Sequence, residues 1–198
     1  MIKIGITGGI GSGKTTICKV FETFGIPVFY ADTVAKEIMV TDPVLVAGVK
    51  AAFGTESYDA TGVLNNKHIA GIVFNDRSQL AILNALVHPA VFRAFENWLL
   101  TVPANAPYIL KEAALLFESG SYQLCDKNIV VIADEAIRLQ RVVNRDGVTQ
   151  DQVKARMDKQ MSDDEKVKMA DYLIRNDNSQ SIILQVLALH QQFLNITE

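Results

Sequence analysis

The chain has little cysteine and no long apolar run. Its two cysteines, Cys18 and Cys125, lack the spacing of a metal-binding cluster, so we expect two free thiols in a reduced, cytoplasmic protein. No uninterrupted apolar stretch approaches the roughly 20 residues that cross a bilayer. The first residues lead directly into a predicted strand, so we expect neither a signal peptide nor a membrane partner.

The chain also lacks a strong charge of either sign. Its formal net charge is −3 and its pI is about 5.6, which argues against broad electrostatic binding to nucleic acid. We found no internal repeat and no low-complexity tract. With 198 residues, 49% hydrophobic and 21% charged, the chain is typical of a globular protein with one α/β core and small insertions.

Residues 8–15, Gly-Gly-Ile-Gly-Ser-Gly-Lys-Thr, fit the phosphate-binding P-loop pattern G-x-x-x-x-G-K-[ST]. Glycines let the backbone turn so that its N–H groups point inward at phosphate oxygens. Lys14 would place a positive charge near the β- and γ-phosphates, and Thr15 would offer its hydroxyl to Mg²⁺. The pattern predicts that nucleotide phosphates are held by Gly9, Gly11, Ser12, Gly13, Lys14, Thr15 and Thr16, with Mg²⁺ at Thr15.

The context of this loop is the one that a P-loop requires. Residues 2–6 form a short apolar run of the kind found in buried parallel strands. After the loop, one helical face is predicted by Ile17, Val20, Phe21 and Phe24, and Gly25 with Pro27 would end this helix. Strand, glycine-rich loop and helix thus follow in the expected order.

Further strands are predicted at residues 28–30, 108–110, 128–132 and 171–174, alternating with helices. This alternation indicates an α/β fold with a five-stranded, parallel, doubly wound sheet. Residues 43–101 have an almost wholly helical pattern, with Asp76 as an N-cap and Pro89 as an interruption. Asp134 and Thr149 are predicted to begin helices, the first of them ended by Gly147, and residues 162–165 resemble a capping box.

We therefore expect three parts. Residues 1–42, 102–137 and 161–198 would form the nucleotide-binding core. Residues 43–101 would form a helical domain that holds an acceptor, and residues 138–160 would form a small lid that excludes water.

Two carboxylates, Asp32 and Glu112, follow predicted strands. Ligands of parallel sheets lie beyond the carboxyl ends of the strands, so both are candidates for the site. Asp32 could accept a proton from an attacking hydroxyl, hold Mg²⁺ through water, or simply cap a helix. Glu112 could orient metal-bound water or form an ion pair with Lys111.

Arg138, Arg141 and Arg145 share one face of a predicted helix. Such a row could clamp a transferring phosphoryl group, and Arg156 could join it; the alternative is a solvated charged face. We favour Arg141 and Arg145 for this role ahead of Arg138. His88 precedes Pro89 and is either an acceptor contact or an ordinary satisfied polar group.

The assembled segments resemble dephospho-coenzyme A kinases over essentially the whole chain. The resemblance rests on residues 4–15, 29–32, 86–89, 115–118 and 141–145, on Arg156 with Gln160, and on Asp171 with Asn176. Residues 4–15 alone fit many P-loop kinases, whereas the joint order, with His88-Pro89 and Leu-Leu-Phe-Glu at 115–118, is far more specific.

This resemblance implies transfer of the ATP γ-phosphoryl group to the ribose 3′-hydroxyl of dephospho-coenzyme A. It implies that Asp32, Lys14 and Arg141 are catalytic, that Arg145 and Asn176 contact the nucleotide, and that Asp32, His88, Glu112 and Glu118 lie on the acceptor side. Many members carry Asp-x-Pro where this chain has Glu112-Ala113-Ala114, so the turn here should be looser. We expect a monomer or a weak homo-oligomer.

Two other functions fit the sequence less well. Another small-molecule kinase, for shikimate or a nucleoside monophosphate, lacks support because the chain has no Gly-Gly-Gly acceptor signature and follows Lys14 with Thr-Thr. A GTPase switch would use D-x-x-G, which residues 59–62 fit. However, no apolar strand leads into that motif, and no N-K-x-D guanine reader exists.

Overall fold

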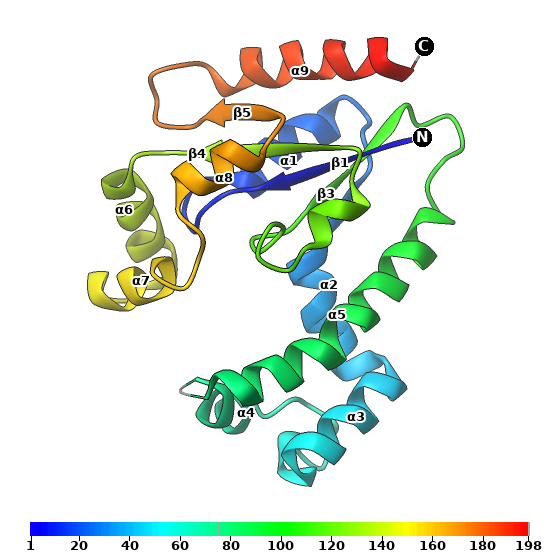
Figure 1. Cartoon of the computed structure of the whole chain (residues 1–198), viewed down its shortest axis with the longest axis vertical. Helices are drawn as coiled ribbons and strands as arrows, with labels where there is room; N and C mark the ends of the chain where they lie inside the picture. Colours follow the sequence, from blue (N-terminus) through cyan, green and yellow to red (C-terminus); the bar gives the residue numbers. More distant parts are fainter. Residues whose placement is uncertain (75, 198) are drawn as a thin grey trace. The chain divides into compact units, whose positions relative to one another are not determined.

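The computed structural model describes residues 1–74 and 76–197. It divides into two compact units, one formed by Met1–Tyr30 with Val102–Glu198 and the other by Ala31–Thr101. Figure 1 shows the chain coloured from its amino terminus to its carboxyl terminus. In the described part, no helix is both long and apolar enough to cross a membrane.

The first unit is built on a five-stranded, all-parallel sheet with the order β2-β3-β1-β4-β5, which confirms the predicted fold class. The strands are β1 (Ile2–Thr7), β2 (Val28–Tyr30), β3 (Tyr108–Glu112), β4 (Lys127–Ile132) and β5 (Tyr172–Arg175). All of β3 is buried, as is most of β1 and β4, because helices cover both faces of the sheet.

The register of the strands brings their carboxyl ends to one edge. Glu112, the last residue of β3, pairs with Ile6 of β1 and with Tyr30 of β2. β1 lies between β3 and β4, and the chain leaves it toward β2 on one side and later reaches β4 on the other. The loop after β1 therefore lies at the switch point of the sheet, where doubly wound folds bind their ligands.

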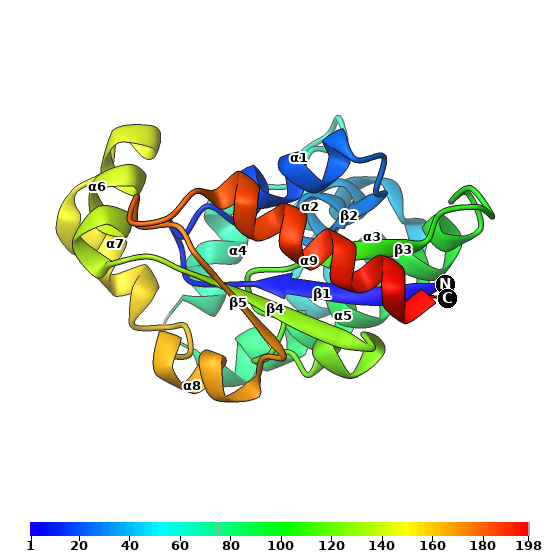
Figure 2. The same cartoon turned by 90° about the horizontal axis from the view of Figure 1, so that it is seen from above.

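Helices cover the two faces of this sheet unequally. α1 (Lys14–Thr23) and α9 (Ile182–Thr197) pack together on one face, and α8 (Asp163–Met169) lies on the other (Figures 1 and 2). α6 (Glu135–Asp146) and α7 (Gln150–Met157) contact each other beyond the end of β4, and a short 3₁₀ turn, η2 (Ser121–Leu124), precedes β4. The core under α1 and α9 includes Ile4, Ile6, Ile17, Cys18, Phe21, Tyr108, Leu110, Ile129, Val186 and Phe193.

The second unit is helical and has its own core. It contains α2 (Ala31–Thr41), α3 (Pro43–Phe53), the 3₁₀ turn η1 (Thr55–Ser57), α4 (Asn66–Val73) and α5 (Arg77–Leu99). Its buried residues are Met39, Leu45, Val49, Phe53, Tyr58, Ile69 and Ala90. α2 belongs to this unit because it packs against α3 and α5.

The predicted interruption at Pro89 is wrong. α5 continues through Pro89 as one helix of 23 residues. A proline inside a helix removes one backbone hydrogen bond and crowds the preceding turn. Here α5 packs against α2, α3 and α4, and residues on both sides of Pro89, Leu86 with Val87 and Ala90, pack in the core of this unit, which offsets that loss. His88 therefore lies within a continuous helix, on its exposed side.

Several predicted helix ends are confirmed. Asp76 accepts hydrogen bonds from the backbone N–H groups of Ser78 and Gln79, at 2.8 and 3.2 Å. Thr149 and Ser162 both form complete capping boxes. α6 ends at Gly147, which adopts the left-handed conformation with φ +65°.

Asp134 differs from this pattern. It occupies the N-cap position of α6, but its side chain makes no capping hydrogen bond, so the predicted cap is wrong in its chemistry. Asp59 of the D-x-x-G segment instead caps a local turn, accepting from the backbone of Thr61 and Val63 at 2.8 and 3.0 Å. The hydrogen bond from the Thr61 hydroxyl, at 2.7 Å, and then these backbone hydrogen bonds lower the pKa of Asp59, which gives this segment a structural role.

The aromatic cluster under α9 should dominate the stability of the first unit. Phe193 is fully buried against Tyr108 and Tyr172, with ring centroids 5.3 and 5.2 Å apart. We expect Phe193→Ala to lower the free energy of unfolding by about 3–5 kcal/mol, because it opens a cavity that the sheet cannot fill. Urea denaturation measures this loss. The control Phe92→Ala removes a ring that is 44% exposed and should cost less than about 1 kcal/mol.

Candidate active site

The loop between β1 and α1 has the geometry of a phosphate cradle. Gly11 and Gly13 adopt φ values of +80° and +91°, a region that side chains strongly disfavour. Ser12 N donates to Gly9 O at 3.1 Å, which closes the loop into a tight turn. Gly13 is the N-cap of α1 and offers no side chain to its first turn, so the backbone amides there are open to an anion.

Lys14 lies across the start of this loop. Its Nζ donates to Gly8 O at 2.9 Å and contacts Gly9 O at 3.5 Å, and the residue is only 9% exposed. The ammonium group is thus held at the loop by neutral carbonyl oxygens. Phosphate oxygens, which carry full charge, would bind it more strongly than these carbonyls do.

Three side chains from other elements also bind the loop. Arg141 Nη1 lies 3.5 Å from Gly11 O, and Asn176 Nδ2 donates to Ser12 O at 2.8 Å. Gln160 Oε1 accepts from the backbone N–H of Ile10 at 2.8 Å. The loop is therefore fixed from outside by α6 and by the segments that precede α8 and follow β5.

Arg138 approaches the loop most closely. A methyl group on Gly9 would collide with Arg138 Nη1, and one on Gly11 would collide with the Arg138 backbone. The side chain of Arg138 is 12% exposed, and its Nη2 lies 3.5 Å from Asp163 Oδ2. Gly11 is thus required both by its left-handed conformation and by the close packing of the α6 backbone, whereas a methyl group on Gly9 would only displace the end of the Arg138 side chain.

Glu112 lies at the same edge of the sheet. It is buried, with 6% exposure, and the following Ala113 N donates to Ile6 O at 3.1 Å. Burial raises the pKa of the Cys18 thiol in α1; Glu112 raises it further, while Lys14 opposes this shift. The hydrogen bond from Ala113 N to Ile6 O ties the turn after β3 to β1.

Arg145 and Glu118 lie apart from the loop. Arg145 is 64% exposed and pairs with Asp146 at 2.7 Å; Arg156 pairs with the same carboxylate at 3.2 Å. The hydrogen bond from Arg145 is the main cause that lowers the pKa of Asp146. Glu118 accepts from Met161 N at 2.9 Å and pairs with Lys166.

Asp32 and His88 belong to the helical unit. Asp32 lies in the first turn of α2, directly after β2, and its residue is exposed. His88 is exposed on α5. Both therefore present polar groups at the surface of their own unit.

Sequence reasoning ranked Arg138 below Arg141 and Arg145 and gave no role to Gln160. Gln160 was noted only as part of a family pattern with Arg156. The signal for Arg138 was present, because it is the arginine of the row closest to the start of α6. The signal for Gln160 was absent, since only the fold brings its side chain to Ile10.

The site fits Mg²⁺ as an ion held chiefly by nucleotide and water. Among the described residues, no group of three or more His, Cys, Asp or Glu side chains could hold a metal. Mg²⁺ retains several waters and needs only one or two protein ligands when phosphates bind it. Thr15, exposed in the first turn of α1, and Glu112 at the adjacent strand end supply oxygens of this kind.

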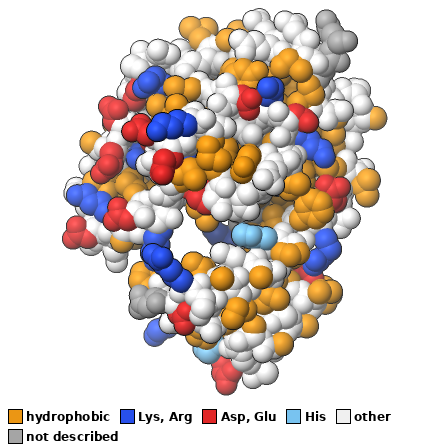
Figure 3. All heavy atoms as spheres, in the orientation of Figure 1, with side chains coloured by type: hydrophobic (Ala, Val, Ile, Leu, Met, Phe, Trp, Pro, Cys, Tyr) orange, Lys and Arg blue, Asp and Glu red, His pale blue; other side chains and the backbone are white. Residues whose placement is uncertain are grey.

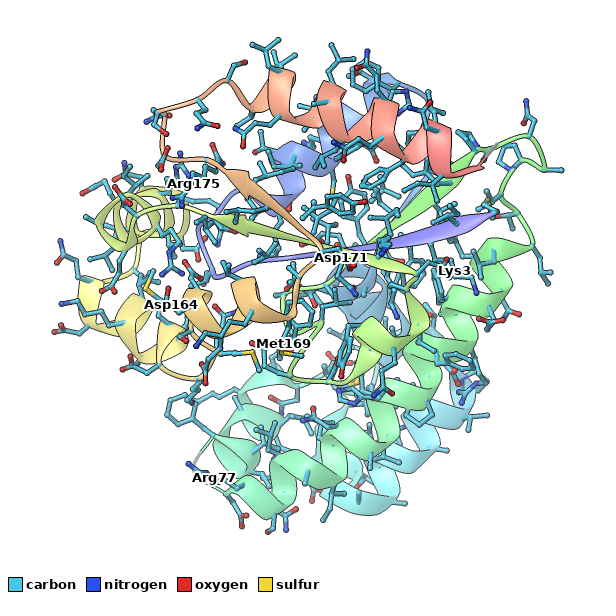
Figure 4. The ribbon with its side chains drawn as sticks, turned by 45° about the horizontal axis from the view of Figure 1, so that its top comes forward. Lys3, Arg77, Asp164, Met169, Asp171 and Arg175 are labelled. Atoms are coloured by element: carbon cyan, nitrogen blue, oxygen red, sulfur yellow. The ribbon has the colours of Figure 1, made fainter. Side chains whose placement is uncertain are left out.

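The surface around α6, α7 and α8 mixes both charge signs. Figure 3 shows acidic and basic side chains interspersed on the side of this region that is in view. Figure 4 places Asp164 on α8 and Arg175 at the end of β5. Asp164 also lines a cavity of about 360 Å³ together with Glu135, Arg138, Met157, Gln160 and Asp163.

Comparisons with known proteins agree with this geometry. The family model described as dephospho-CoA kinase (CoaE) matches residues 2–181. A dephospho-CoA kinase of Chlorobaculum tepidum is 40% identical over 201 residues, covering 98% of this chain and 96% of the relative.

Solved structures are similar as well. A crystal structure of a Thermus thermophilus protein matches with a TM-score of 0.87 and 32% identity, covering 98% of this chain and 97% of that one. The dephospho-CoA kinase of Campylobacter jejuni matches with a TM-score of 0.70 and 26% identity, covering 99% and 98%. The chain therefore belongs to the dephospho-CoA kinase family of P-loop kinases, and its activity is the final step of coenzyme A biosynthesis.

Proposed function

We propose that ATP binds with its phosphates in the loop of residues 8–15, and that its γ-phosphoryl group passes in line to the ribose 3′-hydroxyl of dephospho-CoA. The observation that carries this proposal is the cradle itself, which combines left-handed glycines, an uncapped helix start and the Lys14 ammonium at one strand end. Positioning and electrostatic stabilisation supply most of the acceleration in phosphoryl transfer.

Each residue of the proposed site has a defined role in this reaction. Lys14 exchanges its carbonyl contacts for phosphate oxygens, and the amides of residues 13–16 bind the phosphates. Arg141, already at Gly11, stabilises charge on the transferring group. Asp32 accepts the proton of the 3′-hydroxyl as its oxygen attacks the γ-phosphorus, and ADP leaves with the former bridging oxygen. Mg²⁺, when bound at Thr15 and Glu112 through water, neutralises charge on the phosphates.

The remaining residues are assigned by their positions. Asn176 contacts the loop through Ser12 and lies beside Gly13, which supports a place on the nucleotide side. We assign Arg145 to the lid, His88 and Asp32 to acceptor binding, and residues 43–101 to the acceptor domain. Residues 138–160 form the lid. The protein acts in the reduced cytoplasm as a monomer or weak homo-oligomer.

The acceptor position is tested by product analysis. Incubation with ATP and dephospho-CoA should give ADP and a product of the mass and chromatographic behaviour of coenzyme A. The 2′-phosphate isomer, used as a standard, distinguishes the two hydroxyls. Formation of that isomer, or greater turnover with shikimate or a nucleoside monophosphate, would contradict the assignment.

Lys14→Met tests the cradle. The substitution keeps the length of the side chain but removes the charge that stabilises the transferring phosphoryl group. We expect kcat to fall by about 10²–10³-fold and the Kd for ATP to rise, measured by coupled ADP detection and calorimetry. Unaltered ATP binding and turnover would remove the loop from the site. Near-ultraviolet circular dichroism checks that the variant is folded.

Asp32→Asn tests the proposed base. The amide has the shape of the carboxylate but cannot take the proton, so kcat should fall by about 10²–10⁴-fold while the Kd for ATP stays unchanged. Glu37→Gln is the matched control, because it removes a second exposed carboxylate from the same helix. Its kcat should equal that of the unmodified enzyme. Equal turnover by both variants would exclude Asp32 as the base.

A further inference from the structure

A fully buried lysine in α8 has no role in the mechanism above. The side chain of Lys166 is 0% exposed, and its Nζ lies 3.0 Å from Glu118 Oε1. Glu118 belongs to the turn after β3 and is 19% exposed at its side chain. Removing an ammonium group from water is costly, and a buried charge of this kind persists only with a partner. Glu118 therefore fixes α8 to the turn after β3.

The same carboxylate oxygen holds a second point of the chain. Glu118 Oε1 accepts a hydrogen bond from Met161 N at 2.9 Å. Residues 161 and 166 are thus attached to one acid, and the capping box of Ser162 and Glu165 stiffens the backbone between them. The segment from Gln160 to Lys166 is thereby held as one piece, which we call the brace.

The brace reaches the P-loop at two places. Gln160 Oε1 accepts from Ile10 N at 2.8 Å. Asp163 Oδ2 lies 3.5 Å from Arg138 Nη2, and the other terminal nitrogen of Arg138 lies against Gly9. The first half of the loop, Gly9 and Ile10, is therefore shaped by groups that the brace positions.

Hydrogen bonds carry more of this contact than apolar packing does. The brace borders the cavity of about 360 Å³, whose lining includes Gln160, Met161 and Asp163. Gln160 consequently lacks close packing on that side, and its position depends on the Ile10 amide and on the anchor at Glu118. A loop that is fixed before its ligand arrives loses less conformational freedom when it binds.

We propose that Glu118, Lys166 and Gln160 are positioning residues that hold the first half of the P-loop ready for nucleotide phosphates, with Glu118 as the anchor and Gln160 as the contact. The inference rests on the proposed nucleotide site at residues 8–15. In this proposal Glu118 supports the loop through Met161 and Gln160. It does not contact the acceptor, whereas the family resemblance implies such a contact.

Gln160→Met tests the contact. The substitution keeps similar volume but removes the oxygen that accepts from Ile10. The Kd values for ATP and ADP should each rise about fivefold, the value of one net hydrogen bond, while the KM for dephospho-CoA stays unchanged. Isothermal calorimetry with each nucleotide and steady-state kinetics measure these changes.

Asn65→Leu is the matched control. Asn65 also accepts a hydrogen bond from a backbone amide, that of His68 at 3.1 Å, but at the N-cap of α4 in the helical unit. The substitution should lower the melting temperature without changing nucleotide affinity. Unchanged or tighter ATP binding by Gln160→Met, or equal weakening by both variants, would overturn the proposal.

A double-mutant cycle tests the anchor. Lys166→Met should weaken ATP binding in the native background, but add little in the Gln160→Met background, because the path to Ile10 is already broken. Additive effects would show that Lys166 does not act through Gln160. If Lys166→Met fails to fold, Glu118→Gln with Lys166→Met removes both charges and keeps an acceptor for Met161 N.

These experiments distinguish a failure of the brace proposal from a failure of the proposed nucleotide site at residues 8–15. Lys14→Met reports on the cradle, whereas the brace variants leave Lys14 in place. Weak ATP binding by Lys14→Met beside normal binding by Gln160→Met would discard the brace alone. Normal binding by Lys14→Met would discard the nucleotide site on which the brace depends.

Discussion

The structure depends on one requirement of the backbone between β1 and α1. The chain must leave a buried central strand, reverse within six residues and start a helix while keeping its amides free for an anion. Left-handed glycines make the turn possible, and the missing helix cap leaves the amides open. Lys14 is the loop's own side chain that binds its start, and Arg141, Asn176 and Gln160 bind the loop from distant parts of the chain. Much of the α6–α8 region can be understood as support for this turn.

Parallel pairing explains why these supports meet. In a parallel sheet every strand ends at the same edge, so segments far apart in sequence emerge beside one another. Ile6, Glu112 and Tyr30 are level in the register, and Asn176 follows β5 at the same edge. The loop between β1 and α1 and the side chains that bind it thus lie at the edge of the sheet, at the point where the strand order reverses.

Sequence patterns predicted the elements of the fold that depend on interactions between residues close together in the chain. Apolar runs identified all five strands, and Asp76, Thr149, Ser162 and Gly147 marked helix ends through hydrogen bonds made within a few residues. Pro89 was misjudged because packing on three helices, which no local pattern contains, outweighs one lost hydrogen bond. Arg138 and Arg145 share a helix face but lie about 10 Å apart along the axis, at 1.5 Å per residue. The periodicity of the sequence shows that these arginines share one face of α6. Only the fold shows which end of that face contacts the loop between β1 and α1.

The thiol of Cys18 lies completely buried in α1, and burial, together with Glu112, raises its pKa and keeps it protonated. A thiol reagent can reach it only when α1 lifts from the sheet, so its modification rate counts such openings. Cys125, only partly buried, provides an internal reference in the same molecule. The rate of Cys18 modification, relative to that of Cys125, therefore measures how often α1 opens. A nucleotide bound at the start of α1 would lower that rate.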